Sequence, residues 1–235
     1  MQKVRIIGIS AYFHDSAAAL IENGKIIYAS QEERFTRIKH DSNFPKNALK
    51  DLLDFNNIKL TDVDYVVFFE KPFLKFERLI ETYLAFAPRG FKQFLFAIPI
   101  WIKNKLFMKN EILNELKKFD KNFSEKNILF SEHHLSHAAS AFFPSPFDEA
   151  LIFTADGVGE WATTSVAVGR NNIIDIKKEI NFPNSLGLLY SSFTYYLGFK
   201  VNSGEYKVMG LAPYGNPKYC EIIKKYLIDV KQDGS

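Results

Sequence analysis

Apolar runs separated by turn residues open the chain and predict a small sheet. The run VRIIGIS is typical of a buried strand, and SAAALIENGKIIYASQEE holds two further apolar stretches. Asn23-Gly24 separates those two stretches, and this dipeptide is a strong signal for a two-residue hairpin turn. We therefore expect three strands first, then a helix that begins at Pro45 in FPKNALKDLLDF, and then a buried strand at DYVVFFE.

An aromatic segment of membrane-like composition follows, FLKFERLIETYLAFAPRGFKQFLFAIPIWIKNKLFM. Its longest charge-free apolar run, Phe94 to Ile102, is far short of the ~20 residues that a spanning helix needs. Pro88 and Pro99 are expected to interrupt any longer helix. We therefore predict no membrane span, but two amphipathic helices on either side of Pro88-Arg89-Gly90 that pack on protein rather than on lipid.

The opening pattern recurs about 145 residues later, in ALIFTADGVGEWATTSVAVGRNNIIDIKKEI. The recurrence predicts an α/β protein built from duplicated β-β-β-α subdomains that face each other. The first subdomain would span residues 1–147, with a helical insertion near 72–122, and the second would span 148–235. Because the pattern of strands then stops, we expect the second subdomain to be incomplete and the chain to be the N-terminal piece of a longer protein.

Composition narrows the class of protein. The 235 residues are 47% hydrophobic and 24% charged, which is ordinary for a globular protein. The net charge of +3, without any block of like charges, argues against nucleic acid as a partner. The single cysteine, Cys220, excludes an internal disulfide and fits a reducing compartment. Since no apolar signal segment precedes the first strand, we expect a cytoplasmic protein.

The segment SEHHLSHAAS holds three of the five histidines. On a helix, His133 and His137 project to one side, whereas His134 lies roughly 100° around the axis. Such histidines are also common as ordinary polar residues of helices. Asp156, however, ends the apolar run ALIFTAD, where a carboxylate is well placed as a third metal ligand. Two imidazoles and a carboxylate suit iron(II), zinc or manganese, and their ligand atoms should then lie within about 5 Å of each other.

Five motifs, in order, resemble one known family. They are GISAYFHDSAAAL, QEERFTRIKHDSNFP, HHLSHAASAFFPSPF, TADGVGEWATT and GEYKVMGLAPYG, and they extend from about Ile6 to the last residue. The chain resembles the N-terminal half of the O-carbamoyltransferases of nodulation-factor and antibiotic biosynthesis. The resemblance implies an actin/hexokinase-like (ASKHA) fold, akin to the transfer domain of the tRNA threonylcarbamoyl enzymes, and such a fold would account for the duplicated opening.

The resemblance also implies a chemistry. In the family the transfer domain binds a metal, often iron, through an HxxxH pair and aspartates, and the metal holds the phosphate of carbamoyl-adenylate. His133, His137 and Asp156 match the two histidines and the first aspartate. A later aspartate ligand would lie beyond Ser235, as would a C-terminal YrdC-like domain that makes carbamoyl-adenylate from carbamoyl phosphate and ATP. The fragment alone is therefore expected to be inactive.

Further site residues are expected from the same resemblance. His14, beside Asp15 in the loop after the first strand, would be the general base near the acceptor, although a structural hydrogen bond to the loop is the alternative. Lys39 is a candidate for a phosphate contact, although charges in EERFTRIKH more commonly form a solvated face. The glycines around Asp156 and near the C-terminus permit close backbone approach to a phosphate, or simply form a tight turn and a packed helix–strand junction. Contacts to the nucleotide or carbamoyl-adenylate are expected at Lys39, Asp156, Gly157, Gly159, Glu205, Lys207 and Gly210.

The sequence thus predicts the transfer domain of an O-carbamoyltransferase. It would move a carbamoyl group from carbamoyl-adenylate to a hydroxyl of a small molecule such as a sugar. A sugar or acid kinase of the same fold is one alternative, but it has no reason to carry His133, His137 and Asp156 together. A non-catalytic binding fragment is the other, because a metal ligand and several strands are missing.

Overall fold

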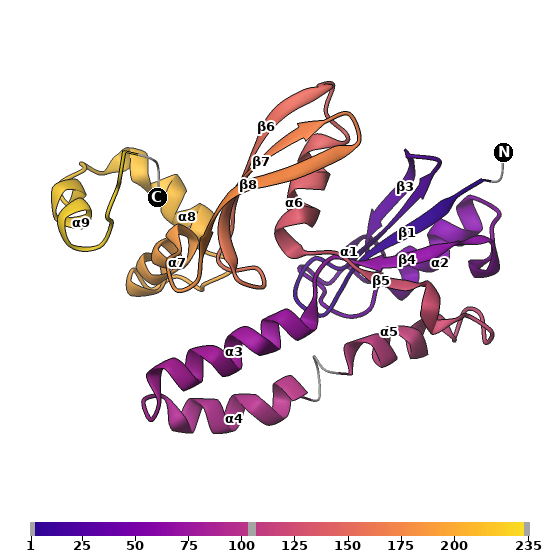
Figure 1. Ribbon diagram of the computed structural model, residues 1–235, viewed down its shortest axis with the longest axis horizontal. Coiled ribbons are helices and arrows are strands. Elements are labelled where there is room, and N and C mark those ends of the chain that lie inside the picture. The colour runs from indigo at the N-terminus through magenta and orange to yellow at the C-terminus, as the bar shows by residue number, and fades with distance from the viewer. Residues whose placement is uncertain (1–2, 103–106, 233–235) are drawn as a thin grey trace. The chain divides into compact units, whose positions relative to one another are not determined.

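The apolar runs of the N-terminal part form a mixed five-stranded sheet (Figure 1). The computed structural model describes residues 3–102 and 107–232. The strand order is β3-β2-β1-β4-β5, and β1 pairs antiparallel with β2 and parallel with β4. The first strand of the chain is therefore the central strand of this sheet. The strands are β1 (Arg5–Ser10), β2 (Ala17–Glu22), β3 (Lys25–Gln31), β4 (Tyr65–Phe68) and β5 (Ile128–Phe130).

The predicted hairpin turn joins β2 to β3. Asn23 and Gly24 have φ of 50° and 80°, the two left-handed conformations that a type I′ turn requires. The Val4 N–H donates to Asn23 Oδ1, and the Asn23 N–H donates to the Val4 carbonyl, each at 2.9 Å. These two bonds tie the turn to the residue before β1, so the prediction from the Asn-Gly pair is confirmed.

One apolar core holds this first part together. Alternate residues of β1, Ile7 and Ile9, are buried, as expected for a strand that buries one face. The helices α2 (Lys46–Phe55) and α5 (Met108–Leu116) contribute residues at helical spacing to the same cluster. Their buried side chains are Ala48, Leu49, Leu52 and Leu53 of α2, and Met108, Ile112 and Leu116 of α5. The short helices α1 (Glu33–Thr36), η1 (Leu60–Asp62) and η3 (Glu125–Asn127) connect these elements.

A buried carboxylate fixes the start of α2. Glu32 is 1% exposed and accepts hydrogen bonds from the backbone N–H of Asn47 at 3.0 Å, the Asn47 side chain at 2.7 Å and the Ala48 N–H at 2.8 Å. The first N–H groups of a helix have no partner within the helix, and the helix dipole favours negative charge there. Glu32 therefore caps α2 from the end of β3, although Pro45 at the entry offers no side-chain cap.

The aromatic segment forms two helices, α3 (Pro72–Phe86) and α4 (Phe91–Trp101), which lie side by side (Figure 1). The turn at residues 88–90 is where the sequence predicts it. Pro99 does not end the second helix but lies inside it, because it falls in the last turn, where it costs only the bond to the Leu95 carbonyl. The two helices contact each other, as expected for helices that pack on protein. However, no residue of α4 is buried, so most of its surface is exposed. Among the described helices, none combines the length and the apolar character needed to cross a bilayer.

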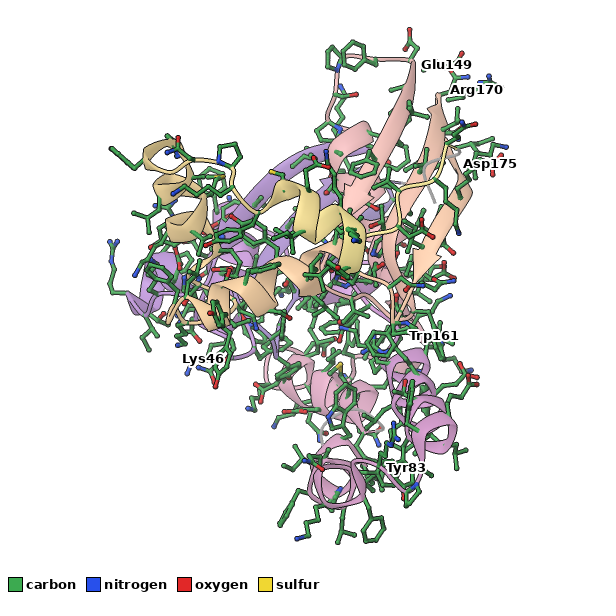
Figure 2. All side chains as sticks on the ribbon, turned by 90° about the vertical axis from the view of Figure 1, so that its left-hand side faces the viewer. Lys46, Tyr83, Glu149, Trp161, Arg170 and Asp175 are labelled. Atoms are coloured by element: carbon green, nitrogen blue, oxygen red, sulfur yellow. The ribbon has the colours of Figure 1, made fainter. Side chains whose placement is uncertain are left out.

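The C-terminal part contains a second, three-stranded sheet with the order β6-β7-β8, antiparallel throughout. At the far end of the β6–β7 pair, Arg170 Nε donates to Glu149 Oε1 at 2.8 Å (Figure 2). The elements are α6 (His133–Phe142), β6 (Glu149–Ala155), β7 (Ala162–Arg170), β8 (Ile173–Asn181), α7 (Leu186–Tyr196), α8 (Glu205–Leu211), η4 (Ala212–Tyr214) and α9 (Cys220–Tyr226).

Helix α6 belongs largely to this second sheet. Ala138 and Phe142 of α6 form a buried cluster with Ile152 of β6 and Ala167 of β7. The Phe142 ring lies so close to β7 that a Cβ on Gly169 would be 2.7 Å from it, so a side chain there would have to displace this buried ring. The chain accordingly divides into two units, Met1–Ser136 and His137–Ser235. The division into compact units falls inside α6. The subdomain boundary at 147/148 stays a prediction.

The observed architecture is α/β with a mixed sheet, and each unit has an antiparallel three-stranded β-β-β arrangement. In the first unit β1 has a parallel neighbour, β4, on its other side. In the described part of the second unit, β6 has no strand on the corresponding side. The ASKHA fold, the duplication and the incompleteness of the second subdomain stay predictions.

The cap by Glu32 gives a test of the first unit's stability. We expect Glu32→Ala to lower the free energy of unfolding by about 3 kcal/mol, because it leaves several buried or half-buried donors without their charged acceptor. Urea unfolding followed by circular dichroism measures the loss. Lys50→Ala, an exposed change on the same helix, should stay within about 0.5 kcal/mol of the unchanged protein. Equal small effects of both substitutions would show that the cap is unimportant.

Candidate metal centre and histidine loop

Helix α6 presents two imidazoles to one carboxylate. His133 and His137 are one turn apart on α6, and Asp156 directly follows β6. One ligand atom from each of the three residues lies within 4.8 Å of the others. The His137 Nε2 and Asp156 Oδ2 atoms are 3.7 Å apart. The structure therefore brings together the three residues that the sequence predicts as metal ligands, at the separation it predicts.

A metal ion would require the three ligand atoms to approach one another. Two ligand atoms that each lie about 2.1 Å from one ion are about 3.4 Å apart in tetrahedral geometry and about 4.2 Å apart when they face each other across the ion. A pair at the 4.8 Å limit must therefore approach by roughly 0.6 to 1.4 Å. The side chains of His137 and Asp156 are 50% and 33% exposed, which leaves room for that approach. Two histidine nitrogens and one carboxylate oxygen fill only three coordination positions of an ion. Because this site is open to solvent, a further ligand could occupy the others.

The buried carboxylate of Glu70 lies near His133. The His133 side chain is 10% exposed, and its Nδ1 lies 3.8 Å from Oε2 of Glu70. Glu70, directly after β4, is itself 1% exposed and accepts a hydrogen bond from Lys75. The Phe69 ring centroid lies 5.6 Å from that of His133. A metal-bound histidine commonly has a carboxylate near its other ring nitrogen, which orients the ring.

Backbone contacts fix Asp156 at the end of β6. Its N–H donates to the Thr163 carbonyl at 2.8 Å, and its Oδ1 accepts from the Gly157 N–H at 2.7 Å. Ser185 caps α7 and donates to the Gly157 carbonyl at 2.7 Å. In the first turn of α7, a Cβ on Gly187 would lie 2.8 Å from the Asp156 carbonyl carbon. The start of α7 therefore packs directly on the backbone that carries the predicted ligand.

His134 is not a member of the three-residue group. His134 is buried, with 3% of its surface exposed, and its ring centroid lies 6.1 Å from that of His133. This placement agrees with the helical geometry, which turns position 134 away from the face that carries positions 133 and 137.

A second histidine cluster lies in the loops of the first unit. Asp15 has His14 Nδ1 at 2.8 Å from its Oδ2 and His40 Nδ1 at 3.0 Å from its Oδ1. Both Asp15 and His40 have positive φ, 52° and 58°, so two uncommon backbone conformations are maintained where these side chains meet. Partial burial favours a raised pKa for Asp15, but the hydrogen bonds from His40 and His14 outweigh it and lower the pKa below its ordinary value.

The remaining predicted residues are Lys39 in the first unit and Gly157, Gly159, Glu205, Lys207 and Gly210 in the second. Lys39 is exposed beside His40, and the Lys207 Nζ lies 6.0 Å from the Tyr206 ring centroid. Glu205 begins α8 and accepts from Ser191 Oγ and the Asn202 N–H at 3.0 Å each, and from the Gly204 N–H at 3.1 Å. Burial favours a raised pKa for Glu205, but these hydrogen bonds outweigh it and lower the pKa below its ordinary value. The carboxylate thus accepts backbone N–H groups of the loop that precedes α8. Gly157 and Gly159 lie in the loop between β6 and β7, and Gly210 lies in α8.

The sequence did not predict that Glu70 lies near His133. It also did not predict that Asp15 is hydrogen-bonded to both His14 and His40. Glu70 ends the run DYVVFFE as Asp156 ends ALIFTAD, so an acid at the end of a buried strand was the available signal. The pairing of His40 with Asp15 had no such signal, because it joins loops that are 25 positions apart.

The comparisons with known proteins identify the family of this α/β protein. A family profile described as Carbamoyltransferase N-terminus matches residues 5–235. The chain is 36% identical over 213 residues to the nodulation protein NolNO of Sinorhizobium fredii, covering 88% of this chain and 29% of that protein. The chain therefore belongs to the carbamoyltransferase N-terminus family.

Two further similarities extend the comparison. The uncharacterized protein sll1178 of Synechocystis sp. is 58% identical over 232 residues, which are 98% of this chain and 38% of that protein. The chain thus spans well under half the length of these curated relatives. Among solved structures, YeaZ from Pseudomonas aeruginosa is similar with a TM-score of 0.37 and 13% identity, covering 78% of this chain and 68% of that one.

The packing of α7 on Asp156 yields a prediction. Gly187→Ala should displace the Asp156 backbone and weaken zinc binding by about 10–100-fold, the range seen when the support of a ligand is lost. Isothermal titration with zinc measures the affinity. Gly215→Ala is the matched control, because a Cβ there meets only an ordinary contact of 3.6 Å. Unchanged affinity in Gly187→Ala, with the fold intact, would show that Asp156 is not a ligand.

Proposed function

We propose that the chain is the carbamoyl-transfer part of an O-carbamoyltransferase. The observation that carries the proposal is the convergence of His133, His137 and Asp156 within 4.8 Å in a chain of the carbamoyltransferase N-terminus family. The transfer would be from carbamoyl-adenylate to a hydroxyl of a small molecule such as a sugar. Formation of carbamoyl-adenylate from ATP and carbamoyl phosphate is assigned to a YrdC-like region outside this chain.

The three residues would hold a divalent metal, with iron(II) preferred and zinc or manganese as alternatives. Such an ion, when bound, supplies a positive charge that binds and stabilises the phosphate of the adenylate. Because Glu70 lies on the Nδ1 side of His133, Nε2 of that ring would be the atom offered to the ion. The loop at Gly157 and Gly159 would lie against the adenylate, together with Lys39, Glu205, Lys207 and Gly210.

His14 would be the general base. With Asp15 accepting from Nδ1–H at 2.8 Å, the second ring nitrogen, Nε2, carries the lone pair. The acceptor hydroxyl gives its proton to Nε2 while its oxygen forms a bond to the carbamoyl carbon, and the bond from that carbon to the phosphate oxygen of AMP breaks. The lowered pKa of Asp15 keeps its carboxylate ionised near neutral pH, where it stabilises the imidazolium that forms.

Metal binding is testable without knowledge of the acceptor. His137→Ala removes a half-exposed ligand and should weaken zinc binding by more than the 10–100-fold typical of losing an outer partner, so by over about 100-fold. His40→Ala is the matched control, because its side chain is 43% exposed and lies in the other cluster. His134→Ala should likewise leave zinc binding largely intact. Retention of full affinity by His137→Ala would remove α6 from the metal site.

The transfer step has its own test in the complete protein. Given radiolabelled carbamoyl phosphate, ATP and a panel of sugar acceptors, His14→Ala should transfer label about 10²–10⁴-fold more slowly. Asp15→Asn should show a smaller loss, because it removes the charge but keeps the shape. Pyrophosphate release, which reports adenylate formation, should continue in both variants. A transfer rate unchanged in His14→Ala would exclude this histidine as the base.

A further inference from the structure

His40 shares one carboxylate with the proposed base. Asp15 has His14 Nδ1 at 2.8 Å from its Oδ2 and His40 Nδ1 at 3.0 Å from its Oδ1. An ionised carboxylate only accepts hydrogen bonds, so in both rings Nδ1 is the atom that carries the proton and donates. In the proposed transfer step His14 and Asp15 both act, whereas His40 has no part. The structure nevertheless places its donor on the oxygen of Asp15 that His14 leaves open.

The loops that carry these residues are joined through their backbones. The Tyr12 N–H donates to the Ser42 carbonyl at 2.7 Å, and the Ser16 N–H donates to the Asp41 carbonyl at 2.9 Å. These two bonds lie on either side of Asp15 and join the loop after β1 to the segment before α2 without the side chain of His40. What the imidazole of His40 adds is therefore a contact to the carboxylate itself.

His40 is in turn held from the side of α1. Its backbone N–H donates to Glu33 Oε2 at 3.1 Å, and its φ is 58°. A residue other than glycine in this left-handed region costs energy and persists only where the surrounding contacts maintain it. Such conformations cluster at functional sites, where a side chain must be held in one place. The ring of His40 thus approaches Asp15 from an anchored position.

A second hydrogen bond changes what the carboxylate can do. The terminal torsion of an aspartate is broad, so a carboxylate with one partner can turn about its last bond. The side chains of Asp15 and His14 are 36% and 51% exposed, so water competes for both. Burial favours a raised pKa for Asp15, and the hydrogen bond from His40 opposes it at least as strongly as the bond from His14 does. The bond from His40 is therefore no weaker a restraint on this carboxylate than the bond from the proposed base.

We infer that His40 is a positioning residue for the proposed base. By donating to Oδ1 of Asp15 it holds Oδ2 toward His14 Nδ1, and so keeps the Nε2 lone pair of His14 directed to the acceptor hydroxyl. His40 acts through Asp15 and takes no proton in the reaction, since the proton of the hydroxyl goes to His14 Nε2. The inference rests on the proposed role of His14 in carbamoyl transfer. All three residues belong to the first unit.

The backbone conformation of His40 decides which variants test the inference. His40→Gly adopts the positive φ without strain and removes the donor. His40→Asn also tolerates this conformation, and its side-chain amide keeps an N–H donor near the position of Nδ1. Glycine therefore removes the hydrogen bond alone, and asparagine is the conservative variant that should restore it.

The rate of transfer in the complete protein gives the first readout. His40→Gly should lower kcat of carbamoyl transfer about 10–100-fold, which is part of the 10²–10⁴-fold contribution of a general base. The acceptor KM and the release of pyrophosphate should stay unchanged, and His40→Asn should recover most of kcat. Equal losses in the two variants, or a change in KM alone, would overturn the inference.

Nitrogen NMR of the histidine rings gives a second readout, which needs no turnover. In the complete protein, labelled at its histidine nitrogens, neutral His14 should be the Nδ1–H tautomer, and its signals are assigned by their loss in His14→Gln. His40→Gly should shift His14 toward a mixture of both tautomers, and His40→Asn should restore the single form. An unchanged tautomer in His40→Gly would overturn the positioning role, whatever the rate. Unchanged transfer in His14→Ala would instead overturn the proposed base, and with it the role of His40.

Discussion

The packing of α6 on the second sheet is the interaction on which the candidate metal centre depends. Phe142 occupies the space that the missing side chain of Gly169 leaves on β7, and Ala138 is fully buried beside it. Once the end of the helix is fixed in this way, its first turn cannot rotate freely. His133 and His137 are then directed to Asp156, which leaves the sheet one strand away. The packing of Phe142 on Gly169 therefore helps to fix the helix that carries both imidazoles.

Buried carboxylates have two different tasks in this chain. Glu32 satisfies the N–H groups at the start of α2, so its charge serves the fold of the first unit. Glu70 lies beside His133, so in the proposed site its charge would favour one orientation of that imidazole. Asp156 differs from both because it is partly exposed, as a ligand that must reach an ion from solvent needs to be. Of these three acids, Asp156 is therefore the one that solvent can reach.

The elements with local signals could be predicted from the sequence. The Asn23-Gly24 turn, the helix after Pro45 and the i, i+4 spacing of His133 and His137 each depend on residues close together in the chain. Features that depend on distant residues were missed or misplaced. Pairing of His40 with Asp15 joins two loops, and the position of Glu70 beside His133 brings together residues more than 60 positions apart. The exposure of α4 was also unexpected, because an apolar sequence shows what a helix can bury but not whether a partner covers it.

Anomalous diffraction from crystals soaked in zinc tests the central claim most directly, since it places the ion without reference to activity. A single peak is predicted about 2.0–2.2 Å from one nitrogen each of His133 and His137 and from an oxygen of Asp156. The three ligand atoms should then lie closer together than the 4.8 Å within which they lie in this structure. A peak elsewhere, or none at these three residues in crystals that hold zinc at other sites, would contradict the account.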